Sequence, residues 1–152
     1  MLAIKRRGAA QSLLVLFGER PQIEGLGILA APATLDRFFA LWPAPLTVVF
    51  GLRAAIPASG DALTLGVRMP AHDALRQLLL RTGPVTGTSL NRTGESPCET
   101  ADRVAELFPG EIDLLVDGGK TPGGLASTLI DATVEPPLVL RPGAFGWPPA
   151  AL

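Results

Sequence analysis

LTVVFGL at Leu46–Leu52 and ALTLGVRM at Ala62–Met69 are two short runs rich in apolar and β-branched residues. Runs of this length and composition predict β-strands. Between them stand the turn-forming residues Pro57, Ser59 and Gly60, which favour a hairpin or another close connection. The two runs therefore predict neighbouring strands.

Other strand-like runs lie on both sides of this pair. SLLVLF at Ser12–Phe17 is continuously apolar, which predicts a central strand covered on both faces, although so short a run is also compatible with a buried helix. Further strands are predicted at Pro84–Thr88, Ile112–Val116, Ser127–Asp131 and Pro137–Leu140. A glycine-rich loop is predicted at Asp117–Gly124.

Three amphipathic segments predict helices between these strands. The first begins with Thr34 as N-cap and stops at Pro43, and the second follows Pro70 and ends near Gly83. The third begins at SPCE, Ser96–Glu99, which has the form of a capping box with proline at the first helical position. Strands and helices do not alternate strictly, so the expected fold class is α/β (α+β), an open sheet with parallel and antiparallel neighbours.

Length and composition exclude several classes of protein. A chain of 152 residues with 47% hydrophobic residues is long enough for one domain with a real core. The net charge of −1 excludes a global basic field that would hold nucleic acid or an anionic membrane. The aromatic content of 5%, with no tyrosine, argues against a free-standing RNA-binding module.

The cellular compartment follows from the cysteine count and the hydropathy pattern. Cys98 is the only cysteine, which excludes an intrachain disulfide and a multi-cysteine zinc site and favours the reducing cytoplasm. Charged residues, proline or glycine interrupt every apolar run before it reaches the roughly 18 residues of a membrane span. The opening residues do not form a secretory signal, so we expect a cytoplasmic protein with no membrane partner.

Basic side chains are the first candidates for a binding site. Lys5 and Arg7 point to the same side of an extended segment and suit a polyphosphate, unless they are an ordinary basic terminus. Arg68 interrupts an apolar strand and needs a partner or ligand, unless it lies on an edge strand and faces water. Arg141 follows a strand and, by itself, is more often a solvated side chain. His72, the only histidine, is interpreted as structural because it lies in the first turn of a predicted helix.

Hydroxyl, amide and carboxyl side chains are the second group of candidates. TGTSLNRTG at Thr86–Gly94 offers backbone N–H groups, hydroxyls and an amide to phosphate, or else is an ordinary strand-to-helix turn. Ser127 follows two glycines and is by itself typical of a cap or a turn. Asp113, Asp117 and Asp131 match no strong metal motif and are interpreted as structural.

Taken in order, these segments resemble the YrdC/Sua5/TsaC family of threonylcarbamoyl-AMP synthases. The matching segments lie within Ile4–Ala144 and are IKRR with SLLVL, WPAPLTVVF, LTLGVRMPAH, GPVTGTSLNRTGE, IDLLVDGG, GGLASTLID and LVLRPGA. The resemblance implies a twisted, open mixed β-sheet with flanking helices around a concave basic cleft. It further implies a YrdC-like domain at residues 1–144, followed by a flexible tail at residues 145–152.

The resemblance also implies a reaction. Enzymes of this family join L-threonine, bicarbonate and ATP into L-threonylcarbamoyladenylate and pyrophosphate, for the t6A modification of tRNA. We therefore expect a nucleotidyltransferase with ATP as substrate, Mg²⁺ as the assisting ion, and tRNA or other t6A-pathway proteins as further partners. The alternative is a non-catalytic nucleotide- or RNA-binding paralogue that has kept the basic cleft.

Roles for individual residues follow from the same resemblance. Arg68 and Ser127 fall where the family holds threonine. The guanidinium of Arg68 could bind the carboxylate of the amino acid bidentately. The family's first strand and helix, with the motif Pro-Thr-(Glu/Asp)-Thr-x-Tyr-Gly-Leu of the threonine pocket, would precede Ile4, so the implied domain is shortened at its N-terminus. The side chains that would contact ATP are Lys5, Arg7, Thr64, Ser89, Asn91 and Arg141.

Overall fold

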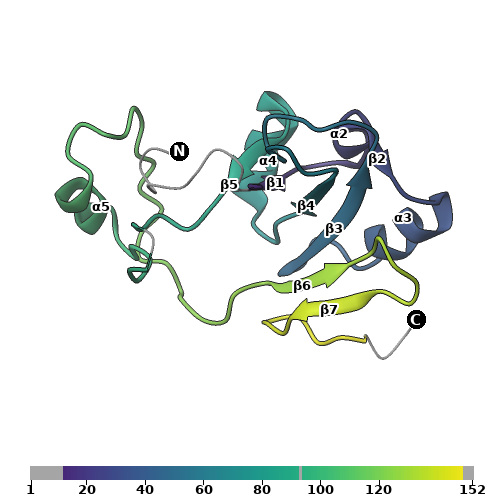
Figure 1. The fold of residues 1–152 in the computed structure, drawn as a ribbon. Coiled ribbons are helices and arrows are strands. Elements are labelled where there is room, and N and C mark those ends of the chain that lie inside the picture. Colours follow the sequence, from purple (N-terminus) through teal and green to yellow (C-terminus); the bar gives the residue numbers. More distant parts are fainter. Residues whose placement is uncertain (1–11, 93, 149–152) are drawn as a thin grey trace. The chain divides into compact units, whose positions relative to one another are not determined.

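The chain divides into two compact units in this computed structural model, which describes residues 12–92 and 94–148. The sheet unit contains the described residues up to 87 and from 125 onward, and the α5 unit is Thr88–Gly124. Each unit is described by itself. Figure 1 shows the sheet with its helices in the first unit and helix α5 (Ala101–Leu107) in the second.

The described residues of the sheet unit form one mixed, open, seven-stranded sheet, which confirms the predicted fold class. Its order is β5-β1-β4-β3-β6-β7, with β2 paired to β3 outside this path. β3 pairs antiparallel with β4 and parallel with β6, while β1 pairs parallel with β4. The strands are β1 (Leu14–Leu16), β2 (Ile28–Leu29), β3 (Leu46–Leu52), β4 (Thr64–Arg68), β5 (Val85–Gly87), β6 (Thr128–Asp131) and β7 (Leu138–Arg141).

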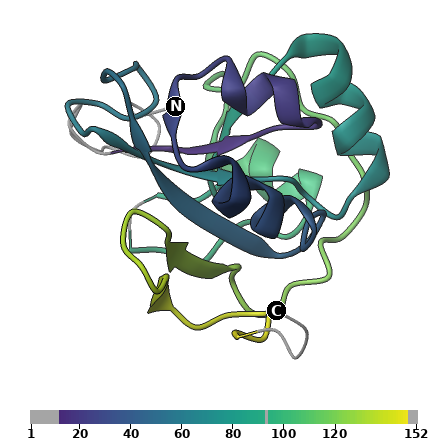
Figure 2. The same cartoon turned by 90° about the vertical axis from the view of Figure 1, so that its right-hand side faces the viewer.

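The hydrophobic core lies on one face of this sheet, beneath helices α2 (Arg20–Glu24) and α3 (Pro32–Phe39). Side chains alternate along a strand, so every second residue of β3 and β4 points to the core. Figure 2 shows α2 and α3 side by side over the sheet. Burial contributes about 1.5–3 kcal/mol for each large apolar side chain. Residues of this core that are fully buried include Phe17, Ile23, Phe38, Leu46, Val48, Phe50, Leu65, Val67 and Ile130.

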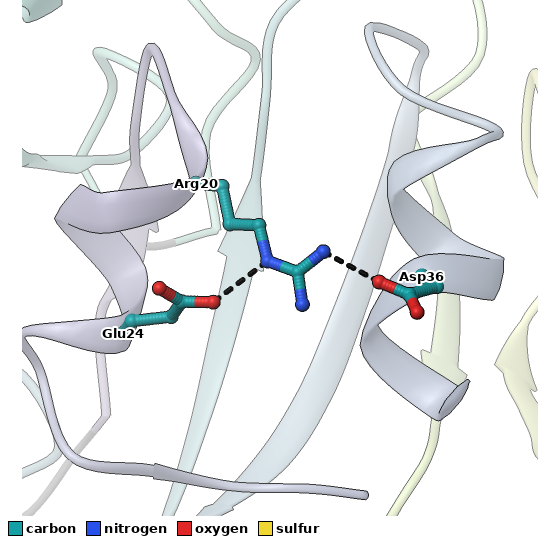
Figure 3. A network of polar contacts seen from close by, with 3 residues as sticks. All are labelled: Arg20, Glu24 and Asp36. Carbon is teal, nitrogen blue, oxygen red and sulfur yellow. Dashed lines mark hydrogen bonds and ion pairs between the residues drawn. The ribbon is translucent and has the colours of Figure 1, made fainter. Parts of the chain in front are cut away.

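Arg20 links the two helices that cover the core (Figure 3). Its Nε donates to Glu24 Oε1 at 2.6 Å within α2, and its Nη1 donates to Asp36 Oδ1 of α3 at 2.5 Å. The guanidinium also lies over the Phe39 ring, 5.2 Å from the centroid. The hydrogen bonds to Glu24 and Asp36 raise the pKa of Arg20. Arg20 therefore has a structural role, and we do not count it among the candidate ligand-binding residues.

Helix α4 (Asp73–Thr82) begins and ends close to the predicted positions. The Nδ1 atom of His72 accepts a hydrogen bond from the backbone N–H of Leu75 at 3.2 Å and caps the helix. Gly83 ends it with a positive φ of 83°, a conformation that glycine adopts without strain. The structural interpretation of His72 is therefore confirmed.

Two predicted helix starts were wrong. Helix α3 begins at Pro32, with Ala31 rather than Thr34 as N-cap, because proline with its fixed φ is preorganised for the first helical position. Helix α5 is capped by Thr100, whose hydroxyl accepts from the N–H of Arg103, and not by the SPCE segment. The backbone N–H of Cys98 donates instead to the carbonyl of Leu90, so this segment pairs with a loop before the helix begins.

The strand predicted at Ile112–Val116 was also wrong. These residues lie outside any described strand, and the side chains of Leu114 and Val116 are 79% and 80% exposed. β-propensity describes how well a residue fits a pleated, half-buried surface, and none of the described strands pairs with this run. Conversely, the sequence did not predict α2 or β2, which are only five and two residues long.

Two residues of the predicted tail at 145–152 pack on the core of the sheet unit. Phe145 and Trp147 are partly buried against it, and the Trp147 ring stacks on Phe38 with centroids 5.8 Å apart. Thr128 fixes the same segment, since its Oγ1 donates to the Phe145 carbonyl at 2.6 Å. In the described part of the chain, no helix has the length and apolar character needed to cross a membrane.

Candidate functional site

The face of the sheet opposite the core carries polar side chains from adjacent strands. Alternation along β4 directs Thr64, Gly66 and Arg68 to this second face, since Leu65 and Val67 point to the core. β3 is the next strand of the sheet, and its Thr47 lies on the same face. The second face of β3, β4, β6 and β7 is therefore the place where the predicted site residues of this unit can meet.

Two buried hydroxyl groups meet on this face. The Oγ1 atom of Thr47 and the Oγ atom of Ser127 are 2.8 Å apart and share a hydrogen bond. Thr47 is 5% exposed and Ser127 is 8% exposed. Ser127 stands directly before β6, which runs parallel to β3 with Leu46 opposite Thr128. A buried hydroxyl needs a hydrogen-bond partner, and each of these two supplies one to the other.

Arg141, at the end of β7, is joined to this hydroxyl pair. Its Nη2 donates to the carbonyl oxygen of Ser127 at 3.0 Å and, over a longer 3.4 Å, to the Ser127 Oγ. β7 runs antiparallel to β6, which places Arg141 opposite Leu129. The structure therefore brings together Ser127 and Arg141, which the sequence had assigned to threonine and ATP respectively.

Arg68 supplies the second positive charge of this face. It lies on β4, between β1 and β3, so the alternative of an edge-strand arginine facing water was wrong. Its Nε is buried and has no hydrogen-bond partner among the described residues. Burial lowers the pKa of Arg68, and the positive charge of Arg141 lowers it further. Arginine nonetheless stays protonated in proteins, so Arg68 is a cation whose Nε has no hydrogen-bond acceptor among residues 12–92 and 94–148.

Thr64 lies on the same face but at the other end of β4. Arg68 lies four positions further along the extended strand, a distance of about 13 Å at roughly 3.3 Å per residue. Its side chain is exposed. Thr64 therefore stands apart from Thr47, Ser127, Arg141 and Arg68.

Ser89 and Asn91 belong to the α5 unit, where they hydrogen-bond to each other. The Ser89 Oγ donates to Asn91 Oδ1 at 2.7 Å, and the Asn91 Nδ2 donates to the carbonyl of Glu95 at 2.6 Å. Arg92 ties this loop to the segment directly after α5, because its Nη2 contacts Glu111 Oε1 at 2.9 Å and its guanidinium lies 5.3 Å from the centre of the Phe108 ring. Side chains of this predicted anion-binding turn thus hydrogen-bond within the loop, and its binding of an anion stays a prediction.

Several predicted residues are not part of either group. Lys5 and Arg7 lie outside the described residues. Asp117 and Asp131 accept hydrogen bonds from their own loops, at the N–H groups of Gly119 and Thr133. Across residues 12–92 and 94–148, no group of three or more His, Cys, Asp or Glu side chains is placed to hold a metal ion.

The sequence prediction missed Thr47. A signal was present, because Thr47 is the one residue of LTVVFGL with a polar side chain. A hydroxyl that is buried within an otherwise apolar strand needs a hydrogen-bond partner. The partner, Ser127, lies eighty positions away in the sequence, so local patterns could not identify it.

Comparisons with known sequences give a consistent result. A Sua5/YciO/YrdC family model, described as "Telomere recombination", matches residues 1–143. The threonylcarbamoyl-AMP synthase of Pyrococcus abyssi is 43% identical over 107 residues, which cover 68% of this chain and 32% of that protein. A putative threonylcarbamoyl-AMP synthase of Mycobacterium tuberculosis is 31% identical over 145 residues, which cover 94% of this chain and 67% of that protein.

A solved structure has the same fold. The crystal structure of P. abyssi Sua5 complexed with L-threonine is 35% identical in sequence and superposes with a TM-score of 0.79. The match covers 93% of this chain and 43% of the P. abyssi chain. This chain therefore spans less than half of that protein.

Proposed function

Because the chain belongs to the Sua5/YciO/YrdC family, we propose that it acts as a threonylcarbamoyl-AMP synthase-type nucleotidyltransferase. The proposed reaction joins L-threonine, bicarbonate and ATP, and it yields L-threonylcarbamoyladenylate, pyrophosphate and water, with the adenylate used for the t6A modification of tRNA. Relatives named threonylcarbamoyl-AMP synthase support this reaction, as does a related structure that contains L-threonine.

The observation that carries the proposal is the buried Nε of Arg68, which has no hydrogen-bond partner in the described part of the chain and feels the charge of Arg141. A buried N–H group without an acceptor costs free energy, and an anionic oxygen of a ligand would remove that cost. The threonine carboxylate is the proposed partner, because a guanidinium and a carboxylate match in a bidentate geometry. The Ser127 hydroxyl would donate to the same amino acid, since its Oγ already lies among polar groups on this face.

ATP is the second proposed substrate. The side chains that the resemblance assigns to ATP, and that we propose to contact it, are Thr64, Ser89, Asn91 and Arg141. Lys5 and Arg7 would add positive charge around the phosphates. In the proposed chemical step, a carbamate oxygen of N-carboxythreonine, which forms from threonine and bicarbonate with loss of water, attacks the α-phosphorus and pyrophosphate leaves. The contribution of the protein is positioning and neutralisation of phosphate charge.

Mg²⁺ is implied by the resemblance, but the described residues do not fit a metal site of their own. In nucleotide sites, Mg²⁺ is commonly held by substrate phosphates with one or two carboxylates and water. Bound in that way, the ion would supply additional neutralisation of phosphate charge. No step of the proposed reaction is assigned to it.

Threonine-dependent release of pyrophosphate tests the proposal. The full chain is incubated with ATP, Mg²⁺, threonine and bicarbonate, and pyrophosphate and the adenylate are measured with each substrate omitted in turn. We expect release only when all substrates are present, and its loss in Arg68→Ala but not in the surface control Arg81→Ala. Retained ATP or tRNA binding without threonine-dependent release would favour the alternative of a non-catalytic nucleotide- or RNA-binding protein.

A further inference from the structure

The branched side chain of Thr47 is held between two neighbouring strands. β3 lies between β4 and β6 in the sheet. Toward β4, the Cγ2 methyl of Thr47 lies 3.5 Å from the point where a Cβ atom of Gly66 would stand. Toward β6, its Oγ1 lies 2.8 Å from the Ser127 Oγ. A β-branched side chain has few allowed rotamers, and the observed one directs the methyl toward Gly66 and the hydroxyl toward Ser127.

Among the described residues, the hydrogen-bond partner of the Thr47 hydroxyl is the Oγ atom of Ser127, and either hydroxyl can be the donor. The Ser127 Oγ also receives a long contact from Arg141 Nη2, at 3.4 Å. A serine hydroxyl has one donor and two lone pairs. If Thr47 and Arg141 occupy the two lone pairs, the remaining O–H of Ser127 is available to a ligand.

We propose that Thr47 is a positioning residue that donates to the Ser127 Oγ and thereby directs the Ser127 O–H to the amino-acid substrate. This inference rests on the proposed function, because it assumes that Ser127 and Arg68 hold threonine. Thr47 itself is 5% exposed and acts through Ser127 without touching the substrate. Its role concerns the affinity for the amino acid and leaves the affinity for ATP unchanged.

Two substitutions separate the hydroxyl from the methyl of Thr47. Thr47→Val keeps the shape and removes the donor, and Thr47→Ser keeps the donor and removes the methyl. We expect Thr47→Val to raise the Kd and KM for threonine by about tenfold, the effect of one hydrogen bond, with the KM for ATP unchanged. Thr47→Ser should restore most of the threonine affinity.

A double-mutant cycle with Ser127→Ala gives the readout that a merely structural role would not produce. If Thr47 acts through Ser127, Thr47→Val will cause no further loss of threonine affinity in the Ser127→Ala protein. Threonine binding is measured by calorimetry at saturating ATP, and pyrophosphate release gives the KM. Thr82→Val is the matched control, because the Thr82 hydroxyl bonds only within the end of α4.

The outcomes distinguish the two proposals. Wild-type protein that binds no threonine would overturn the proposed function and the role of Thr47 together. Wild-type binding with an unchanged Kd in Thr47→Val would overturn the role of Thr47 alone, as would equal losses in Thr47→Val and Thr47→Ser or additive losses in the cycle. If Thr47→Val does not fold, Thr47→Cys, with its weak S–H donor, replaces it in the comparison with Thr47→Ser.

Discussion

The backbone of Gly143 packs directly against that of Ala126. A Cβ atom at position 143 would lie 2.2 Å from the carbonyl oxygen of Ala126 and 2.6 Å from the backbone of Ser127. The next residue, Ala144, donates its N–H to the same Ala126 carbonyl at 2.9 Å. This close approach holds the segment after Arg141 against the segment that carries Ser127, so the geometry of the candidate site depends on a glycine.

Gly143→Ala is therefore expected to destabilise the protein and to move Ser127. Backbone atoms cannot yield as a flexible side chain does, and the cost of such overpacking is about 1–3 kcal/mol of unfolding free energy. Urea unfolding measures the change. Gly146→Ala is the matched control, because nothing lies within 4 Å of a Cβ at that position. Equal stability of the two variants would contradict the tight contact.

Arg68→Lys is expected to weaken threonine binding selectively. Lysine keeps the positive charge but cannot reproduce the planar fork that binds a carboxylate through two hydrogen bonds. We expect the Kd for threonine to rise by about tenfold, corresponding to roughly 1.4 kcal/mol, with the Kd for ATP unchanged in calorimetric titrations. The exposed Arg81→Lys serves as control. An equal loss of ATP affinity would show that Arg68 does not belong to the amino-acid subsite.

The sequence predicted the sheet better than it predicted where helices begin. The run Leu46–Leu52 is largely buried and contains β-branched residues, so burial and β-propensity both favour a strand. Strand β3 has the predicted bounds. The starts of α3 and α5 depend on competition between nearby caps. Helix α3 begins at Pro32 and is not capped by Thr34. Before α5, the backbone N–H of Cys98 donates to the carbonyl of Leu90, and the helix begins after this segment.

The candidate site was predictable only in part, for a related reason. Arg68 is conspicuous because a charge interrupts an apolar strand, and this local signal led to a residue whose Nε lacks a partner in the described structure. Contacts between distant segments leave no local signal. The pairing of Thr47 with Ser127 and the approach of Gly143 to Ala126 follow from the sheet order, which the sequence did not specify.

Lys5→Ala and Arg7→Ala are each expected to weaken ATP binding by about 1–3 kcal/mol, the range for charge-assisted hydrogen bonds. The two residues are separated by one position, so in an extended segment they point to the same side and Arg6 points to the other. Arg6→Ala is therefore the matched control with the same change of charge. If all three variants lose the same affinity for ATP, the effect is one of net charge and not of a specific phosphate contact.

Arg92→Ala is expected to loosen the loop that carries Ser89 and Asn91. The Arg92 guanidinium contacts Glu111 at 2.9 Å and lies over the Phe108 ring. Because both charged groups are partly exposed, the ion pair and the ring contact together contribute only about 1 kcal/mol. Amide hydrogen exchange should become faster throughout this loop and in α5.

Arg103→Ala provides the control for this prediction. Arg103 pairs with Glu106 within α5 at 2.6 Å, but its side chain is 51% exposed and that pair links no separate segments. We expect its loss to leave hydrogen exchange in the loop of Ser89 unchanged. If Arg103→Ala and Arg92→Ala accelerate exchange equally, the loop is not anchored by Arg92, and the arrangement of Ser89 and Asn91 depends on their own hydrogen bonds.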